Sequence, residues 1–320
     1  MNPSASDARV LGPAQTAAAL PWPALMQELE RLLLDPAVHV PARLVQPLPG
    51  GASLFVMPAH DARLAITKLI TFTPANAGSG RPTIQGDVIV TDLATGARTL
   101  LLDGPTVTAR RTAAVSALAA RRLAPHPAGP LLIVGAGVQG RAHLDAFADT
   151  LGVTDVVIAS RSPASAQALA THARSLGLRA RVTADPDAAL ADCPLAVTCT
   201  PASGIVLTAR PGPAHFIAAV GAFTPAMREL APGLCQQVAH AGRVVVDTPQ
   251  ARHEAGDLLQ AGLDVGGFES LADVVQADAA FGEPGYNAGP VLFKSCGWAG
   301  WDLAAARCAV RALAGSSDRR

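Results

Sequence analysis

An apolar strand leads directly into a glycine pattern in the stretch Leu131-Leu132-Ile133-Val134-Gly135-Ala136-Gly137-Val138-Gln139-Gly140. In G-x-G-x-x-G the first glycine permits a tight turn, the second lets the backbone approach a pyrophosphate, and the third lets a helix pack closely on the strand. The amide end of that helix then faces the anion. The stretch predicts a dinucleotide-binding site, with contacts from Gly135, Gly137, Val138, Gln139 and Gly140.

Strand and helix patterns alternate for about five further units after this loop. Apolar runs predict strands at 153–159, 179–183, 195–200, 215–220 and 243–246. Alanine-rich helical patterns at 141–151 and 162–176 lie between them. This alternation predicts an α/β fold with a doubly wound parallel sheet of the Rossmann type, which binds ligands where its strands end. The strand ends expected to converge on one crevice are Gly135, Ser160, Thr200 and Gly221.

The end of the second strand indicates which dinucleotide binds. An acidic residue there would hold the ribose hydroxyl of NAD, but the chain reads Ser160-Arg161-Ser162. An arginine between two hydroxyls can accept a 2′-phosphate through charge-assisted hydrogen bonds. NADPH is therefore the preferred cofactor and NADH the second choice, with a solvated arginine at a helix start as the alternative interpretation.

Composition excludes several classes of function. The formal net charge is zero and no block of basic residues appears, so no nucleic-acid partner is expected. Five cysteines without a C-x-x-C pair indicate neither a disulfide scaffold nor a zinc site, and no metal ligand is expected. No apolar run has membrane-spanning length and no signal peptide is recognised, so we expect a cytoplasmic protein without a membrane partner.

The glycine loop begins late, so a separate substrate domain is expected before it. The pattern indicates a helix at 22–34, a largely antiparallel sheet from strands at 53–57, 64–72, 83–92 and 98–102, and a helix at 106–123. A helix at 300–314 is expected to fold back on this domain. We therefore expect a substrate-binding domain at 1–124 with 296–320, and a dinucleotide-binding domain at 125–295.

Lysine occurs only twice, at Lys68 and Lys294, while arginine supplies the other 23 of the 25 basic residues. Where most cations are arginines, a retained primary amine favours a site that needs a compact, titratable charge. Lys68 lies inside the apolar strand pattern at 64–72, where an ammonium must meet an anion or face a cavity. For two residues, chance retention stays open as the alternative.

Several motifs together resemble the ornithine cyclodeaminase and mu-crystallin family of NAD(P)-dependent enzymes. In order along the chain they are Pro41-Ala42-Arg43, Met57-Pro58, Lys68, Asp103-Gly104, the run Thr108 to Ser116, Gly135 to Gln139, Gly256-Asp257-Leu258, and Phe293 to Gly297. The resemblance implies a homodimer formed through the first domain, which is then also a dimerisation domain. It implies a substrate held between that domain and the nicotinamide, with Arg43, Lys68 and Arg111 on its carboxylate.

Three cations from separate elements can clamp a carboxylate, two of them through planar forks. Adjacent helical residues point about a hundred degrees apart, so only one of Arg110 and Arg111 can face inward. The family's R-T-A-A pattern favours Arg111, with Arg110 solvated. Lys68 and Arg111 are the catalytic candidates. The remaining expected cofactor contacts are Thr83, Arg111, Thr112, Ser160, Arg161, Ser162, Thr200, Val220, Gly221, Lys294 and Ser295. His143 is interpreted as a helix-surface or capping residue.

Departures from the family pattern narrow the expected activity. Cyclodeaminases carry an Asp within G-x-D-x-P-G-K-x-E-L that acts on the substrate amine, whereas here Phe223 takes its place and Met227 replaces the lysine. Phe55 stands where cyclodeaminases place a Glu. Phenyl rings cannot transfer protons but suit an apolar ring of substrate, so both are candidate substrate contacts.

These features predict an NAD(P)H-dependent reductase of cyclic ketimines, acting on 1-pyrroline-2-carboxylate to give L-proline and on 1-piperideine-2-carboxylate to give L-pipecolate. The alternatives are an ornithine cyclodeaminase or an amino-acid dehydrogenase such as alanine dehydrogenase, and an NADPH-dependent small-ligand binding protein like mu-crystallin. Nothing in the sequence places Asp302 or Tyr286 relative to the site.

Overall fold

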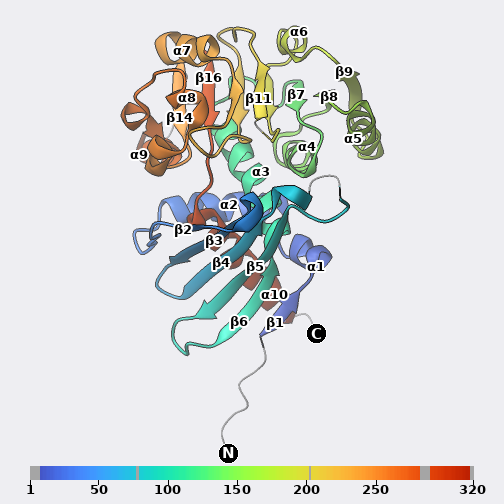
Figure 1. The fold of residues 1–320 in the computed structure, drawn as a ribbon. Coiled ribbons are helices and arrows are strands. Elements are labelled where there is room, and N and C mark those ends of the chain that lie inside the picture. The colour runs from blue at the N-terminus through green and yellow to red at the C-terminus, as the bar shows by residue number, and fades with distance from the viewer. Residues whose placement is uncertain (1–7, 77–78, 202, 282–288, 318–320) are drawn as a thin grey trace, which may run out of the picture. The chain divides into compact units, whose positions relative to one another are not determined.

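The structure is a computed structural model that describes residues 8–76, 79–201, 203–281 and 289–317. The chain divides into two compact units (Figure 1). Unit 1 comprises Met1–Arg111 with Trp298–Arg320, and unit 2 comprises Thr112–Gly297. The first boundary lies inside a helix and not in the proline-rich segment after residue 124, where the sequence placed it. The reason is that the second half of this helix forms its contacts within unit 2, as in the hydrogen bond between Ser116 and His143.

Unit 1 contains a six-stranded sheet in the order β1-β6-β5-β4-β3-β2. Its strands are β1 (Arg9–Leu11), β2 (Leu44–Pro47), β3 (Ser53–His60), β4 (Leu64–Phe72), β5 (Ile84–Asp92) and β6 (Arg98–Asp103). β2 to β6 pair antiparallel, and only β1 pairs parallel, with β6. The expected antiparallel sheet is therefore confirmed. Its tight turns follow from their residues, since the Asp61 carboxylate accepts the Leu64 amide at 2.7 Å and Asp92 accepts that of Thr95 at 2.9 Å.

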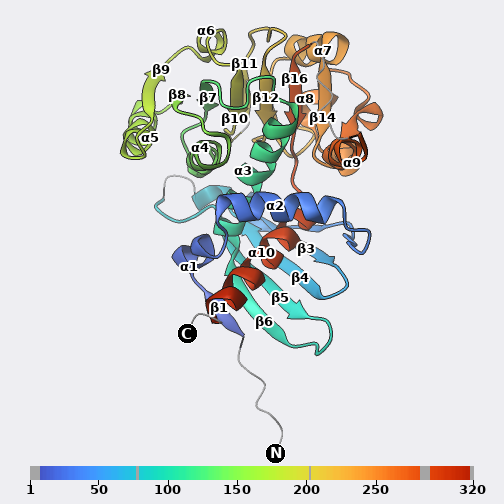
Figure 2. The same ribbon diagram turned by 180° about the vertical axis from the view of Figure 1, so that it is seen from behind.

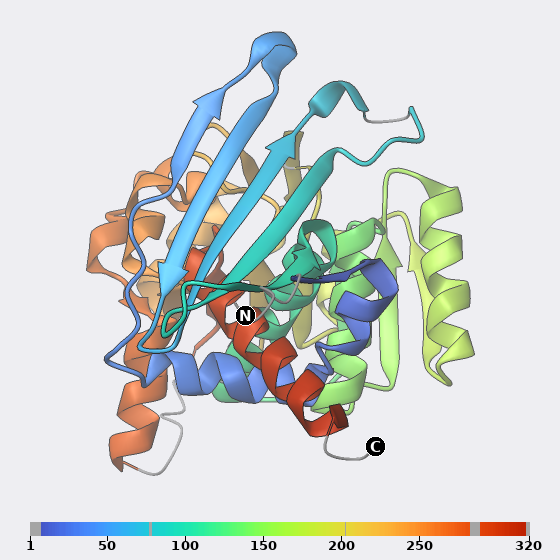
Figure 3. The ribbon, with the colours of Figure 1, turned by 90° about the horizontal axis from the view of Figure 1, so that it is seen from below.

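Three helices accompany this sheet: α1 (Pro13–Ala18), α2 (Trp22–Leu33) and α10 (Ala299–Ser317). α2 and α10 pack together over one face of it (Figure 2). The prediction that the last helix folds back on the first domain is confirmed. Strand alternation fits this cover, because Met57 on β3 and Ile66, Lys68 and Ile70 on β4 are buried on the helix-facing side. The same sheet is seen from another direction in Figure 3.

Helix α3 (Gly104–Leu123) runs from unit 1 into unit 2 and begins where β6 ends. The side chain of Asp103 accepts hydrogen bonds from the amide and hydroxyl of Thr106, at 2.8 and 2.5 Å. This bonding satisfies an orphan amide at the helix start, as an N-cap does. From Arg111 to Ala120 every residue of α3 is buried, so this helix is a core element and not a surface one.

Unit 2 is built on an eight-stranded, wholly parallel sheet in the order β15-β14-β16-β12-β10-β7-β8-β9. Its strands are β7 (Leu131–Val134), β8 (Asp155–Ala159), β9 (Arg179–Thr183), β10 (Leu195–Thr198), β12 (Phe216–Ala219), β14 (Arg243–Val246), β15 (Glu269–Ser270) and β16 (Val291–Lys294). β7 is an interior strand of this sheet, between β10 and β8. The predicted doubly wound sheet is confirmed.

The connections of unit 2 contain α4 (Val138–Leu151), α5 (Pro163–Ser175), α6 (Pro186–Leu190), α7 (Pro232–Ala241), α8 (Gly256–Leu259) and α9 (Leu271–Phe281). A separate two-stranded sheet pairs β11 (Ser203–Leu207) with β13 (Arg228–Leu230). Ser162 caps α5, as predicted, by accepting the Ser165 amide at 3.2 Å. Within the described ranges, no helix is long and apolar enough to cross a membrane.

Two strands of the parallel sheet were not foreseen, the two-residue β15 and the four-residue β16. β16 is inserted between β12 and β14, although both precede it in the chain. Its four residues, Val291 to Lys294, are all buried. A run this short with a lysine at its end gives too little periodicity to predict a strand, so β16 is identified only by its pairing with β12 and β14.

Candidate functional site

The glycine loop has the geometry that a dinucleotide requires. Gly135 follows β7 with a φ of +119°, which disfavours any side chain, and a Cβ on Gly140 would stand 2.0 Å from the Gly135 carbonyl oxygen. By contrast, a Cβ on Gly137 would meet no atom within 4 Å. Gly137 is the N-cap of α4 and has no side chain to cover its amides. This open helix start fits a pyrophosphate.

Several strands of unit 2 end at one edge of its parallel sheet, where side chains link the segments that follow them. The Cys199 thiol lies 3.2 Å from the Gly135 carbonyl oxygen. One carboxylate, that of Glu229, accepts the amide of Thr200 at 2.6 Å and that of Gly221 at 2.7 Å. Glu229 is fully buried and burial raises the pKa of its carboxyl group. It therefore fixes two loops that we expected to contact the cofactor.

Lys294 lies beneath this edge. Its ammonium is fully buried, pairs with Asp257 at 2.9 Å and donates to the carbonyl oxygen of Ala222 at 2.6 Å. Asp257 in turn accepts the amide of Glu229 at 2.6 Å. Burial opposes the charge on Lys294, but Asp257 and Glu229 outweigh it and raise its pKa. An ammonium enclosed in this way does not support the expected direct cofactor contact, and its geometry is that of a structural support.

Of the other expected cofactor contacts, some are engaged within the protein and others are exposed to a ligand. Ser295 donates its hydroxyl to the buried Asp247 at 2.9 Å. The amide of Val220 donates to the carbonyl oxygen of Thr198 at 2.9 Å. Val138, at the start of α4, is 72% exposed, so it lies open to a ligand where Ser295 does not.

The segment after β8 contains one open cation. Arg161 is exposed, and Ser160 accepts the amide of Ser162 at 3.3 Å. The Ser162 hydroxyl is engaged with Ser165 in capping α5. Arg161 and Ser162 are both exposed, and the guanidinium of Arg161 is the charged group of this triplet that could bind a 2′-phosphate.

His143 is not a surface residue, contrary to the sequence interpretation. It is fully buried on α4, with its ring nitrogens 2.8 Å from the Gln139 carbonyl oxygen and 3.0 Å from the Ser116 hydroxyl. Burial lowers its pKa to about 4. Ser116 also donates to the carbonyl oxygen of Thr112 at 3.2 Å. A neutral histidine thus links Thr112 to the end of the glycine loop.

In unit 1, Lys68 and Arg111 converge on one carboxylate. The Lys68 ammonium lies 3.1 Å from Oδ1 of Asp302, and the Arg111 Nε lies 3.4 Å from the same oxygen. Lys68 and Asp302 are buried, and Arg111 is only 6% exposed. Arg43, half-buried before β2, is near enough to Lys68 to influence its pKa. The three predicted carboxylate ligands thus occupy one region of unit 1.

Asp302 is the residue of this group that sequence reasoning did not place. The sequence feature that could have identified it is an acidic side chain inside the alanine-rich helical pattern at 300–314. Of the two neighbouring arginines, Arg111 is the one that faces Asp302. Arg110 turns the other way, lies over the Trp22 ring at 3.7 Å and donates to the Leu20 carbonyl oxygen, so it is held and not solvated.

The remaining expected site residues within the described ranges are Phe55, Phe223 and Thr83. Phe55 is half-buried on β3 in unit 1, on the same sheet face as Lys68. Phe223 is half-buried in unit 2 and packs against its core. Thr83, just before β5, is half-buried and its carbonyl oxygen accepts the Thr73 amide at 2.8 Å. Tyr286 lies outside the described residues.

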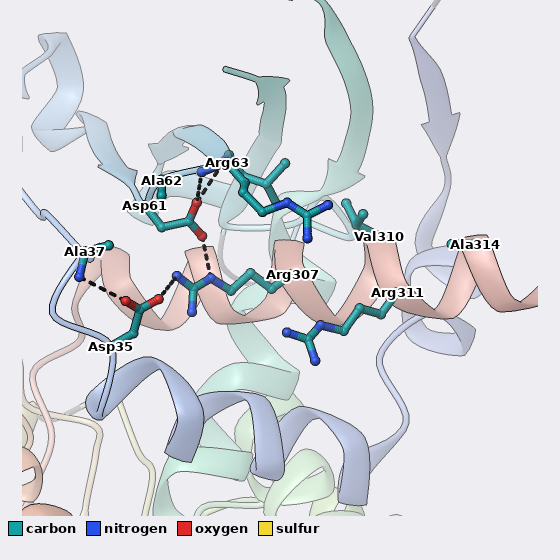
Figure 4. Close-up of a pocket in the computed structure, with 10 residues that line it drawn as sticks. Asp35, Ala37, Asp61, Ala62, Arg63, Arg307, Val310, Arg311 and Ala314 are labelled. Atoms are coloured by element: carbon teal, nitrogen blue, oxygen red, sulfur yellow. Dashed lines mark hydrogen bonds and ion pairs between the residues drawn. The ribbon is translucent and has the colours of Figure 1, made fainter. Parts of the chain in front are cut away.

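Unit 1 also contains a cavity of about 320 Å³ beside α10. Arg307 crosses it between Asp61 and Asp35, with 2.7 Å to the second (Figure 4). A further carboxylate, Glu28, lies 3.8 Å from the same guanidinium. The central charges are therefore paired within the protein, and the cluster joins α10 to the β3–β4 turn and to the end of α2.

Comparisons with known proteins show which proteins the chain is similar to. The chain is 40% identical to Delta(1)-pyrroline-2-carboxylate reductase 1 of Burkholderia multivorans, covering 97% of both chains. It is 39% identical to a Delta(1)-pyrroline-2-carboxylate/Delta(1)-piperideine-2-carboxylate reductase of Azospirillum brasilense, over 95% of this chain and 96% of that one.

A solved structure supports the fold. The Delta(1)-pyrroline-2-carboxylate reductase of Thermococcus litoralis, in complex with NADH and L-proline, superposes with a TM-score of 0.87 at 23% identity, covering 97% of this chain and 98% of that one. The model of the ornithine cyclodeaminase/mu-crystallin family matches residues 18–316. The chain therefore belongs to the ornithine cyclodeaminase/mu-crystallin family.

Proposed function

We propose that this protein is an NAD(P)H-dependent oxidoreductase that reduces cyclic ketimines bearing a carboxylate beside the C=N bond. Its substrates are 1-pyrroline-2-carboxylate, which gives L-proline, and 1-piperideine-2-carboxylate, which gives L-pipecolate. The names of two relatives near 40% identity support this choice. The observation in the structure that supports it most is the excess of positive charge around Asp302.

The charges of this cluster do not balance. Lys68 and Arg111 contribute two positive charges and Asp302 one negative charge, and all three side chains are at least nine-tenths buried. Arg43 adds a further positive charge nearby. Burying an uncompensated charge is unfavourable, so the cluster favours a ligand that brings an anion. A 2-carboxylate satisfies this requirement, and its two oxygens match the planar fork of a guanidinium.

The reaction itself needs little more from the side chains than position. The dinucleotide, when bound, supplies the hydride that adds to the imine carbon, and a proton must reach the ring nitrogen. Arg43, Lys68 and Arg111 hold the carboxylate and thereby orient the ring. Phe55 and Phe223 offer apolar surface and no proton. Cyclodeamination needs several proton transfers to and from the substrate amine, so these two phenyl rings favour the simpler reduction.

The cofactor site fits either dinucleotide, and we propose that NADPH is preferred. Gly137 leaves space for the pyrophosphate, and the amides at the start of α4 can bind it. The exposed guanidinium of Arg161 lies where a ribose 2′-substituent is expected, and no carboxylate stands in the Ser160-Arg161-Ser162 triplet to repel a phosphate.

An absorbance assay tests the activity. Purified protein should oxidise NADPH when either cyclic imine is added, with no added ammonia and with formation of the matching imino acid. Release of ammonia from ornithine without net cofactor turnover would instead identify a cyclodeaminase. Turnover of an acyclic oxo acid only when ammonia is present would identify an amino-acid dehydrogenase. Tight NADPH binding without turnover of any imine would identify a binding protein.

We also propose that the protein forms a homodimer through the sheet face opposite α2 and α10. On that face Leu44, Val56 and Leu69 stand side by side on three adjacent strands. Leu44, on the edge strand β2, is 56% exposed, and Leu69, on the interior strand β4, is 42% exposed, so the three residues form an apolar group open on this face. A second copy of the same face would cover them.

Light scattering on the intact protein tests this assembly. The wild type should have the mass of a dimer, and Leu69→Glu should yield a folded monomer because it buries a charge in the interface. Leu176→Glu, at an exposed position at the end of α5, serves as the control and should stay dimeric. A monomeric wild type, or a dimeric Leu69→Glu, would exclude this interface.

A further inference from the structure

The carboxylate of Asp302 lies at the centre of the cation cluster of unit 1. Oδ1 and Oδ2 lie 3.1 and 3.4 Å from the Lys68 ammonium, and Oδ1 also lies 3.4 Å from Arg111 Nε. These contacts connect β4, α3 and α10, three elements far apart in the sequence. Asp302 is fully buried, whereas Arg111 is 6% exposed.

We propose that Asp302 is a positioning residue for imine reduction, which holds Lys68 and Arg111 side by side so that their remaining donors face the substrate carboxylate. The inference rests on the proposed function. Asp302 acts through the two cations and not on the substrate, because a carboxylate would repel the substrate carboxylate. The Nε of Arg111 faces Asp302 and is buried, so the donors of this guanidinium that a ligand can reach are its terminal nitrogens.

The start of α10 is built to hold Asp302 in place. Asp302 lies in the first turn of the helix, where the amide end of the helix dipole favours a negative charge. The rings of Trp298 and Trp301 meet edge to face at 5.0 Å, and a Cβ on Gly300 would stand 2.1 Å from the Trp298 ring. This close packing leaves the first turn little freedom to shift.

A second attachment lies about one turn and a half further along the helix. Arg307 pairs with Asp35 and Asp61, so α10 is tied to the β3–β4 turn and to the end of α2 (Figure 4). Packing at one point and ion pairs at the other fix both the axial position and the rotation of the helix. The Asp302 carboxylate is therefore in place before any substrate arrives.

Asp302 also determines the charge of Lys68. Burial lowers the pKa of Lys68 most, the positive charges of Arg111 and Arg43 lower it further, and Asp302 raises it, which leaves a value of about 8. The cross-strand neighbours of Lys68 are Met57 on β3 and Val88 on β5, which are uncharged. Asp302 is thus the negative charge that opposes burial and two guanidinium groups.

Loss of this carboxylate has a defined consequence. Without it, the pKa of Lys68 falls by about one unit or more, because an opposite charge within hydrogen-bonding distance shifts a pKa by about 1–3 units. Lys68 would then be largely neutral near neutral pH, and the clamp would lose one of its cations. A role in folding alone would not produce such a change in the titration of one amine.

The two lysines of the chain make this titration directly measurable. Lysine labelled with 13C at the ε position gives one NMR signal each for Lys68 and Lys294, and Lys68→Met assigns them. We expect the midpoint of Lys68 to be lower in Asp302→Asn than in the wild type by about one unit or more. Asp145→Asn is the control, since it removes a carboxylate that pairs with His172 in unit 2 and should leave the midpoint unchanged.

Steady-state kinetics provide the second readout. With saturating NADPH, Asp302→Asn should raise KM for 1-piperideine-2-carboxylate about tenfold, with NADPH affinity unchanged. The alkaline limb of kcat/KM should move to lower pH in parallel with the Lys68 midpoint. Asp302→Glu keeps the charge and should fall between the wild type and Asp302→Asn in both readouts.

The outcomes separate this inference from the proposed function. An unchanged Lys68 midpoint in Asp302→Asn overturns the positioning role, whatever the activity. If Asp302→Asn does not fold, Asp302→Glu decides, since an unchanged midpoint together with an unchanged KM overturns the role. A lowered midpoint in a protein whose wild type reduces neither imine leaves the Lys68–Asp302 arrangement established and overturns only the proposed activity.

Discussion

The only two lysines of this protein are both completely buried and both paired with an aspartate, yet they have opposite electrostatic surroundings. In unit 1, Lys68 shares Asp302 with Arg111, and its pKa is lowered to about 8. In unit 2, Lys294 has Asp257 and the Ala222 carbonyl oxygen as partners, and its pKa is raised.

This contrast shows how a structural ion pair differs from a pair that awaits a ligand. Around Lys294, acceptors saturate the ammonium and link it to Glu229, which fixes the amides of Thr200 and Gly221. Around Lys68, cations exceed anions, so the cluster reaches balance only when an anion binds. Burial and pairing alone therefore do not distinguish the two roles, whereas the local sum of charges does.

The largest effect on stability is expected from Lys294→Met. It leaves Asp257 buried without its cation, which destabilises the folded chain by about 4 kcal/mol. Urea unfolding measures the loss. Lys68→Met removes one cation from a cluster that has an excess of positive charge, so it should lower the free energy of unfolding clearly less than Lys294→Met does. Equal losses for the two variants would contradict the distinction between the lysines.

The largest effect on activity is expected from Lys68→Met and Arg111→Met. Each removes a charged partner of the substrate carboxylate, which should lower kcat/KM for the imine about 300-fold. NADPH affinity of Lys68→Met, followed by fluorescence titration, should stay unchanged because Lys68 is not an expected cofactor contact and unit 2 provides the glycine loop. Kinetics equal to the wild type would remove these residues from the site.

The pH dependence of stability should differ in sign between the two lysines. An unfolded lysine has a pKa of about 10.4, so between about pH 8 and 10.4 the unfolded chain binds more protons at position 68 than the folded chain. As the pH rises through this range, the free energy of unfolding of the wild type should therefore increase by about 3 kcal/mol relative to that of Lys68→Met. The raised pKa of Lys294 predicts the reverse, a stabilising contribution that is complete below about pH 10.4 and is lost above it. Urea unfolding at several pH values checks both.

The smallest effect is expected at Arg161, an exposed cation outside both buried clusters. Arg161→Gln should lower kcat/KM with NADPH about tenfold and leave kcat/KM with NADH nearly unchanged, because one charge-assisted contact to a 2′-phosphate is lost. Arg174→Gln, in the last turn of α5, is the control and should affect neither cofactor. An equal effect on both cofactors would show that Arg161 does not read the phosphate.

Local signals predicted much of the fold. The strand at 64–72 and the strand at 179–183 have the predicted bounds, since alternation and β-branched residues identify a strand without its neighbours. β16 was missed because four buried residues give no period. His143 was misinterpreted because its burial depends on Ser116, a residue of another helix.

The sequence by itself determined the dinucleotide fold and the identity of the cations. Glycine spacing follows from steric limits on single residues, and two lysines among 25 basic residues are conspicuous in any context. Only the tertiary structure decided what those cations do. Asp302 and Asp257 are distant in sequence from the lysines that they contact, and the charge balance of a buried site is a sum over all elements that meet there. The same residue type is thus a structural support in unit 2 and a candidate ligand-binding group in unit 1.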